Sequence, residues 1–259
     1  MHVTELVIIT IYMIACIGLG LYTRKQAAKS TSREFLVAGE SVGSWINGMA
    51  IYAAFATGGT MLGNMGLSYN MGWGYIMTMN MGVTIGFILV AFFIAKPFRN
   101  LRIATVPEFL KIRYDSPTLR ILVPLILIVS ITAYVVAQMK VAGMLGETLL
   151  GIPYVWAVIL VGLVYVFYTA IGGMWAVTLT DFFQGTLMLF IALLGGTIAV
   201  NYGGGVSNLY TQAHNIKNAW TQCQVLPLSS YIGAALVWAT CLCVLPHTIM
   251  RIFSSKDET

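Results

Sequence analysis

Long apolar stretches separated by short polar segments make up most of this sequence. A run of about 17 or more mostly apolar residues is long enough to cross the hydrocarbon core of a bilayer as a helix. Counting such runs predicts seven spans, at residues 5–22, 44–66, 72–95, 119–149, 153–171, 177–200 and 227–250. Runs of this length favour helices over the strands of a β-barrel, which are about half as long. We therefore expect residues 1–259 to form one all-α membrane domain, a polytopic bundle of transmembrane helices.

Two of the polar segments are long enough to hold short helices of their own. In segment 96–118, Thr105 is followed by a proline and then by Glu108, which together are typical of a helix start. Segment 201–226 has a run of glycines near its beginning, and we expect a small helix from Val206 to Asn215.

The composition excludes a soluble domain. The chain is 58% hydrophobic and 9% charged, whereas soluble domains contain roughly 25% charged residues. The net charge of +5 does not indicate nucleic-acid binding, because the basic residues follow the predicted topology. Of the 14 lysines and arginines, 12 lie in three regions: segment 23–43, segment 96–118 together with Arg120 just after it, and the tail after residue 250. Only Lys140 and Lys217 lie elsewhere.

This asymmetry predicts the orientation of the chain in the membrane. Cytoplasmic loops carry an excess of lysine and arginine, so the three basic regions are placed inside the cell. We expect a multi-pass protein of the cell (inner or plasma) membrane, surrounded by lipid, with its N-terminus outside and its C-terminal tail in the cytoplasm.

The second predicted span contains a segment that is poorly suited to a regular helix. Residues 53–66 read AAFATGGTMLGNMG, and each glycine costs about 1 kcal/mol relative to alanine in a helix interior. The adjacent Gly58 and Gly59 therefore predict a helix break, at which freed carbonyl oxygens could bind a cation. The alternative is close helix packing, since Gly59 and Gly63 have the four-residue spacing that lets two spans approach.

Asp181 is the only acidic residue within the interior of a predicted span. An aspartate at that depth costs roughly 2.5–3.5 kcal/mol, so it normally faces a cavity or a partner. A carboxylate in a cavity would bind a passing cation. The alternative is a structural role, as the partner of Gln184 or of a neighbouring helix.

The sequence contains no arrangement of residues that indicates catalysis. It has no nucleophile paired with a base, no Walker loop and no dinucleotide-binding motif, and its three histidines are scattered. We expect neither an enzyme nor a bound cofactor.

Four motifs resemble those of the sodium:solute symporter family, and they occur in the same order. They are FLVAGESVGSW (35–45), ATVPEFLKIRY (104–114), YTAIGGMWAVTLTDFFQG (168–185) and LPHTIMRIFSSKD (245–257). Together with GIPY (151–154), the last two are most similar to the sodium/pantothenate branch.

The resemblance implies a leucine-transporter-like fold, in which an extra helix precedes two inverted repeats of five helices. The first span would be the extra helix, spans two to six the first repeat, and span seven the start of the second. Members of the family are about twice as long, so this chain corresponds to their N-terminal half, and the second inverted repeat is absent. We expect a fragment, a truncated chain, or a partner polypeptide that supplies the missing repeat.

The resemblance also implies a function and site residues. It predicts a symporter that imports a small organic solute, pantothenate-like or another carboxylate, with sodium as the coupling ion. Carbonyl oxygens of Ala53 and Ala56 would bind sodium, and Asp181 would guide it inward. Thr57, Thr60 and Asn64 would face the solute. The rival hypothesis is a seven-helix membrane protein that transports nothing, such as a receptor or an assembly subunit, whose ligand pocket would be complete within seven spans.

Overall fold

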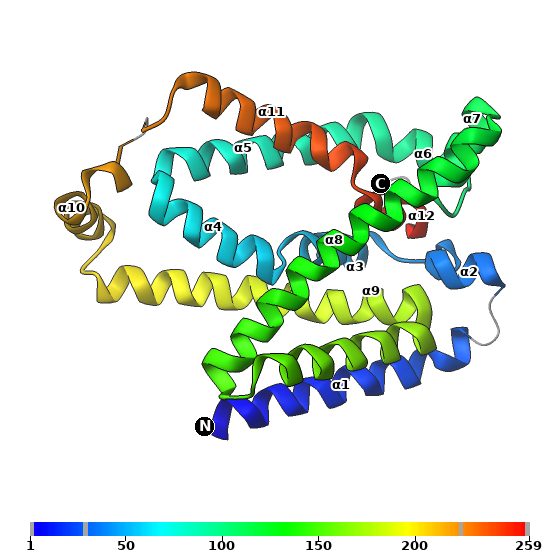
Figure 1. Cartoon of the computed structure of the whole chain (residues 1–259), viewed down its shortest axis with the longest axis horizontal. Helices are drawn as coiled ribbons and strands as arrows, with labels where there is room; N and C mark the ends of the chain where they lie inside the picture. The colour runs from blue at the N-terminus through cyan, green and yellow to red at the C-terminus, as the bar shows by residue number, and fades with distance from the viewer. Residues whose placement is uncertain (1–2, 28–30, 223–224, 257–259) are drawn as a thin grey trace.

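The computed structural model describes residues 3–27, 31–222 and 225–256, which form helices joined by short connections (Figure 1). The helices are α1 (Val3–Ala27), α2 (Ser32–Val37), α3 (Ser44–Phe55), α4 (Gly58–Met71), α5 (Trp73–Leu89), α6 (Lys96–Asn100), α7 (Val106–Tyr114), α8 (Pro117–Leu150), α9 (Tyr154–Tyr202), α10 (Val206–Ile216), α11 (Leu228–Val244) and α12 (Pro246–Ser254). Two short 3-10 turns are η1 (Ala38–Glu40) and η3 (Asn218–Trp220), and the π-helical segment η2 (Val90–Ala95) joins α5 to α6. The all-α class is as predicted.

Fewer helices than expected are long and apolar enough to cross a membrane unaided. Within the described residues there are four: Thr4–Arg24, Trp73–Asn100, Pro117–Leu150 and Tyr154–Tyr202. A fifth crossing is formed if α11 and α12, which meet at an angle of 44°, are one bent span. The difference from seven arises from this bent pair and from two further places where the chain departs from simple straight helices.

The first of these is α9, whose 49 residues cover two expected spans. Its helical geometry fails at Gly173, which has φ 59° and ψ −154°, and the chain reverses direction (Figure 1). A side chain at this φ would be strained, and a Cβ there would also lie 2.7 Å from Cε2 of Phe35 in α2. Glycine at this position therefore lets the chain turn back, so that α9 consists of two helical halves. The turn lies close to the boundary predicted between spans 153–171 and 177–200.

The second is the expected span 44–66, which the structure divides into α3 and α4. Neither helix is long enough to cross a bilayer by itself, since a crossing takes about 20 residues.

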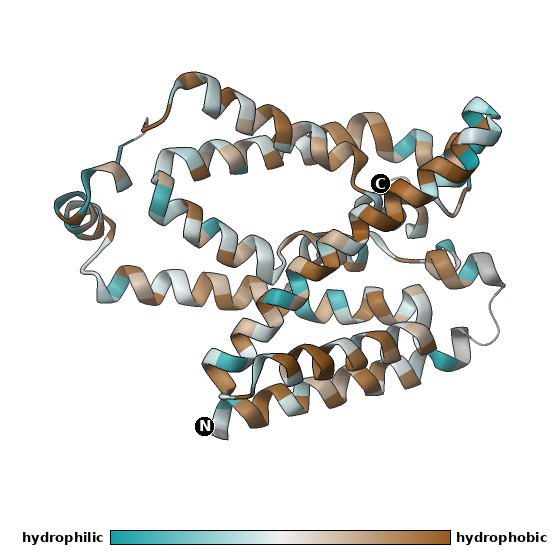
Figure 2. Ribbon diagram, viewed as in Figure 1, coloured by the Kyte–Doolittle hydropathy of each residue, from teal (hydrophilic) through white to brown (hydrophobic). Residues whose placement is uncertain are grey.

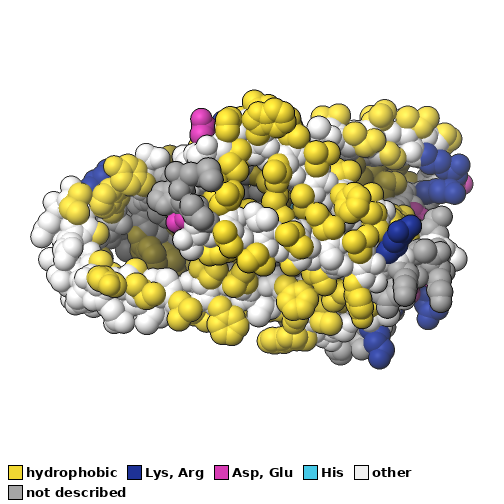
Figure 3. Space-filling view, turned by 90° about the horizontal axis from the view of Figure 1, so that it is seen from below, with side chains coloured by type: hydrophobic (Ala, Val, Ile, Leu, Met, Phe, Trp, Pro, Cys, Tyr) yellow, Lys and Arg dark blue, Asp and Glu magenta, His cyan; other side chains and the backbone are white. Residues whose placement is uncertain are grey.

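Helix packing brings together parts of the chain that are distant in the sequence. α1 and α3 lie against α9, α11 lies against α5, and α8 crosses the molecule diagonally (Figure 1). Hydrophobic residues occupy most of the length of the long helices, whereas hydrophilic residues concentrate in α10 and at helix ends (Figure 2). The face in Figure 3 is mostly hydrophobic, and most of its lysine and arginine side chains gather at one end.

Both predicted short helices are confirmed. α7 begins at Val106, and the Thr105 side chain accepts a hydrogen bond from the Glu108 amide, 3.3 Å away. α10 runs from Val206 to Ile216. Local signals were sufficient here because a cap and a proline specify a helix start without distant partners.

Candidate functional site

The α3–α4 break is a turn of two residues, Ala56 and Thr57. Ala56 has φ −78° and ψ 62°, and the Thr57 amide donates to the Phe55 carbonyl at 2.9 Å. These angles and this bond between residues two apart define an inverse γ-turn. Thr57 then takes an extended conformation, with φ −82° and ψ 164°, and α4 starts at Gly58.

This turn diverts the two amides that would otherwise bond to Ala53 and Ala56. In a continuous helix each amide donates to the carbonyl four residues earlier. The amide of Thr57 donates to Phe55 instead of Ala53, and the amide of Thr60 donates to the Thr57 hydroxyl, 3.2 Å away, instead of Ala56. The break therefore releases the two carbonyl oxygens that the family resemblance assigns to sodium.

The position of the break corrects one expectation. Gly58 and Gly59 do not form the break but the first turn of α4, where they let α4 approach α8. The Gly59 amide donates to Oε1 of Gln138 at 3.2 Å, and a Cβ on Gly59 would lie 2.9 Å from Nε2 of the same side chain. A Cβ on Gly58 would lie 3.0 Å from Cγ1 of Val141. Close packing thus describes Gly58 and Gly59 but not Gly63, because nothing in the described part of the chain lies within 4 Å of a Cβ built on Gly63. The neighbouring turn interrupts the helix.

Thr57 caps α4, and its loss should be measurable. We expect Thr57→Ala to lower the free energy of unfolding by about 1 kcal/mol, because the Thr60 amide loses its acceptor. Thr57→Ser, which keeps the hydroxyl, should lose clearly less. Thermal unfolding in detergent, followed by circular dichroism, compares the two variants. Equal losses would show that the hydroxyl does not stabilise the helix start.

Two cavities meet at the break. The larger, of about 1080 Å³, is lined by Ala53, Ala56, Thr57 and Asp181, among others. The predicted sodium ligands thus lie on one cavity, and Thr57, which was assigned to the solute, faces it as well.

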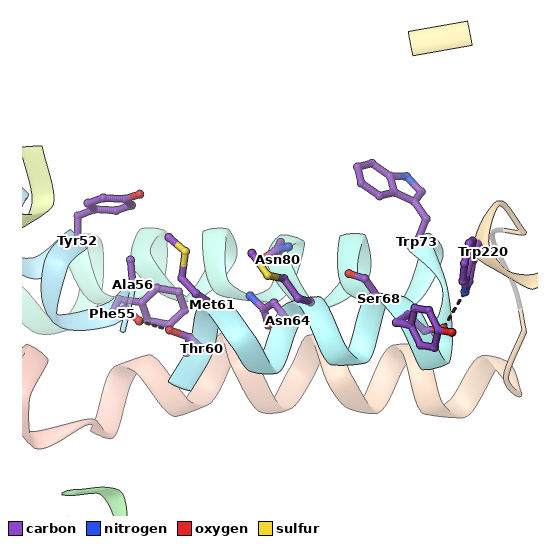
Figure 4. A pocket seen from close by; sticks show the side chains of 12 residues that line it. Tyr52, Phe55, Ala56, Thr60, Met61, Asn64, Ser68, Trp73, Asn80 and Trp220 are labelled. Atoms are coloured by element: carbon purple, nitrogen blue, oxygen red, sulfur yellow. Dashed lines mark hydrogen bonds between the residues drawn. The ribbon is translucent and has the colours of Figure 1, made fainter. Parts of the chain in front are cut away.

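The smaller cavity, of about 720 Å³, holds the remaining predicted solute residues. Thr60 and Asn64 line it, and Ala56 borders both cavities (Figure 4). The Thr60 hydroxyl lies 2.9 Å from the Phe55 carbonyl, so its hydrogen is used within the break. The side chains of Asn64, Ser68 and Asn80 line the same cavity without a hydrogen bond to any residue in the described ranges, and can bond to a ligand.

Asp181 has a charged partner that sequence reasoning missed. Arg251 of α12 donates from Nη2 to Oδ2 of Asp181, and the two side chains are only 6% and 15% exposed. The prediction that Arg251 lies in a tail after the last span is therefore wrong: α12 continues past residue 250, and Arg251 lies inside the molecule. The side of the membrane on which it lies stays a prediction. Gln184 is not the partner of Asp181, because its amide donates to the Tyr12 hydroxyl of α1.

Other contacts hold Arg251 at the cavity. Nδ2 of Asn47 in α3 donates to the Arg251 carbonyl at 3.0 Å, which ties α12 to the first half of the broken helix. The buried Ile249, Ile252 and Phe253 surround it in sequence. This apolar pattern continuing past residue 250 was the signal in the sequence that the tail folds back. His247 stacks on Tyr134, with ring centroids 5.8 Å apart, at the wall of the same cavity.

The arrangement can hold a small cation at the break. Two carbonyl oxygens supply hard, uncharged ligands, and a carboxylate on the same cavity supplies the charge. The Arg251 guanidinium forms an ion pair with this carboxylate in the present conformation, so a cation that reaches Asp181 must compete with Arg251.

Comparison with known proteins relates the sequence of this chain to a family of transporters. The family model described as "SSF: Sodium:solute symporter family" matches residues 35–259. Sodium/proline symporters of Staphylococcus aureus strains JH9 and USA300 are each 29% identical over 264 residues, which cover 97% of this chain and 50% of theirs. The chain therefore spans about half the length of the curated relatives it matches.

One solved structure shares the fold. It is a substrate-bound, outward-open state of a Na⁺-coupled sialic acid symporter in which a novel Na⁺ site is described. The TM-score is 0.69 at 20% sequence identity, and the match covers 94% of this chain and 58% of that one. At this identity the comparison shows the fold and no more.

Proposed function

The chain belongs to the sodium:solute symporter family, and we propose that it supplies the sodium site of a secondary-active symporter that imports a small organic solute. The family is the one that the sequence motifs predict. Its matched relatives are transporters rather than enzymes. Sodium is the coupling ion of this proposal, and a second repeat, on the same or another polypeptide, would complete the transport path.

The release of the Ala53 and Ala56 carbonyls beside the Asp181 cavity carries this proposal. Non-helical backbone at membrane depth is tolerated only where it faces protein or a watery cavity, and unwound carbonyls there coordinate sodium in other transporters. Asp181 attracts the ion, and Arg251 keeps the carboxylate neutralised when sodium is absent. Thr60 and Asn64, with Ser68 and Asn80, would bind the solute in the smaller cavity.

The basic end of the molecule supports the proposed orientation. Lysine and arginine side chains gather there (Figure 3), and this end would face the cytoplasm, as the excess of basic residues in cytoplasmic loops requires. Entry of positive sodium would then follow the membrane potential. One charge moving through 100 mV releases about 2.3 kcal/mol, and a tenfold sodium gradient adds about 1.4 kcal/mol. One ion could therefore drive accumulation of a few hundredfold.

Uptake into proteoliposomes that contain this chain together with the second repeat tests the proposal. Labelled pantothenate, proline and N-acetylneuraminate are offered in parallel under inward gradients of sodium or potassium. We expect at least one of these solutes to enter roughly tenfold faster with sodium, since binding at the break favours that ion by about 1.4 kcal/mol or more. Equal rates in the two salts for every solute would reject sodium coupling. Solute binding that needs no sodium would instead favour a receptor.

A further inference from the structure

The far end of the smaller cavity has a structure of its own. Figure 4 shows Trp73 and Trp220 at the end opposite Thr60. Tyr69 of α4 lines this end as well, so α4, α5 and the turn η3 each contribute one aromatic ring. We call these three side chains the aromatic end.

Specific contacts hold η3 against this end. Nε1 of Trp220 donates to the Tyr69 carbonyl at 2.7 Å, and the two ring centroids lie 5.2 Å apart. Gly72, at the turn between α4 and α5, has φ 80°, and a Cβ there would collide with the Ala219 carbonyl. A tight turn without a side chain is thus what lets the backbone of η3 reach the cavity.

Lys217 places a positive charge at this position. Its Nζ lies 5.7 Å from the ring centroid of Tyr69, 6.0 Å from that of Trp220 and 3.4 Å from the Tyr69 carbonyl. Both ring faces and the carbonyl attract the ammonium group, so they hold it beside Tyr69 and Trp220, which line the cavity, while Lys217 itself is not a lining residue. Lys217 is exposed, and no carboxylate in the part of the chain that the structure describes pairs with it.

The lining of the smaller cavity carries no charge. None of the described residues that line it is acidic or basic, while Asn64, Ser68 and Asn80 offer unpaired polar groups and Met61 and Met65 offer apolar surface. An occupant that fits this lining has a polar and apolar body and carries its negative charge toward Lys217.

We propose that Lys217, held by Tyr69 and Trp220, is a carboxylate-recognition site at the aromatic end of the smaller cavity, and that it selects anionic organic solutes. This inference rests on the proposed function for its role in import, but the binding site itself requires neither sodium nor transport. A purely structural Lys217 would only fasten η3 to α4, and would not favour an anion.

Fluorine NMR of the chain labelled with 5-fluorotryptophan tests the site in nanodiscs. The probes are two nitroxides of the same shape, 3-carboxy-PROXYL, which is anionic, and 3-carbamoyl-PROXYL, which is neutral. We expect the anionic probe to broaden the Trp220 resonance about fivefold more than the neutral one at low salt, the ratio for a unit charge about 4 Å from an ammonium in water. The exposed Trp45 and Trp156 serve as internal controls, at which the two probes should act alike.

Three variants separate recognition from general charge and from folding. Lys217→Met should bring the ratio at Trp220 to about one, and Lys217→Arg should preserve it, since both cations attract a carboxylate. Lys140→Met is the matched control, because it removes the other lysine outside the basic regions without touching the aromatic end. Equal broadening by the two probes in the unmodified chain, or an unchanged ratio in Lys217→Met, would overturn the proposal. Absence of sodium-coupled uptake would reject the proposed transport function but not the binding of the anionic probe at Lys217. The two proposals can therefore be rejected independently.

Discussion

Asp181→Asn is expected to raise the sodium concentration for half-maximal uptake at least about tenfold, with a much smaller effect on which solute is preferred. The substitution keeps the size of the side chain but removes the charge that the structure places on the cavity beside the released carbonyls. A tenfold change corresponds to about 1.4 kcal/mol, well within the attraction between a partly buried carboxylate and a cation. Uptake measured over a range of sodium concentrations gives the result directly.

The Asp181–Arg251 ion pair requires a control for stability. Removing one partner of a buried pair leaves an uncompensated charge, which typically costs about 3–5 kcal/mol, so Asp181→Asn alone should also unfold more easily. The double variant Asp181→Asn/Arg251→Met should regain much of that stability, because neither charge is then left unpaired. It should not regain sodium affinity. Sodium activation that is unchanged in the double variant would remove Asp181 from the ion path.

Gly59→Leu is expected to abolish sodium-dependent uptake while the protein is still made and inserted. Even the first side-chain carbon would lie 2.9 Å from Nε2 of Gln138, so a leucine must displace the side chain that accepts from the Gly59 amide. The Gln138 side chain would then turn away from the Gly59 amide, and the turn at Ala56 would lose the support that this hydrogen bond gives to its carbonyl oxygens.

Gly63→Leu is the matched control for this prediction. Gly63 lies one turn later on the same helix, and nothing stands within 4 Å of a Cβ built there. The same change of residue should therefore leave at least about half of the uptake. Similar losses in both variants would mean that neither of these glycines of α4 tolerates a large residue, and that the contact with Gln138 has no special role.

Local sequence signals predicted much of the fold but misplaced the break. Apolar run lengths located the long helices, and the capping residues located α7, because both depend on residues close together in the chain. The two glycines drew attention to the correct segment. The turn itself lies just before them, at Ala56. The sequence could not locate it, because an inverse γ-turn uses φ and ψ values that any residue can adopt and needs no glycine.

Long-range contacts account for what the sequence could not reveal about the site. Asp181 was identified by its depth in an apolar span, but its partner lies 70 residues further along, and only folding of α12 back into the molecule brings Arg251 to it. The same limit applies to Gln138, which reaches Gly59 from α8 across 79 residues. Single-sequence patterns identify which residues are unusual, whereas packing decides which of them meet.

Carbonyl NMR of the break tests the central claim most directly. Labelling with [¹³C′]alanine and [¹⁵N]threonine selects the Ala–Thr peptide bonds at Ala56–Thr57, Ala104–Thr105 and Ala239–Thr240, of which the last two serve as internal references. When sodium replaces potassium around the protein in nanodiscs, the Ala56 carbonyl resonance should shift in a saturable way and the two references should not. Identical spectra in the two cations would contradict the account, because a carbonyl oxygen that binds sodium cannot keep the same chemical shift.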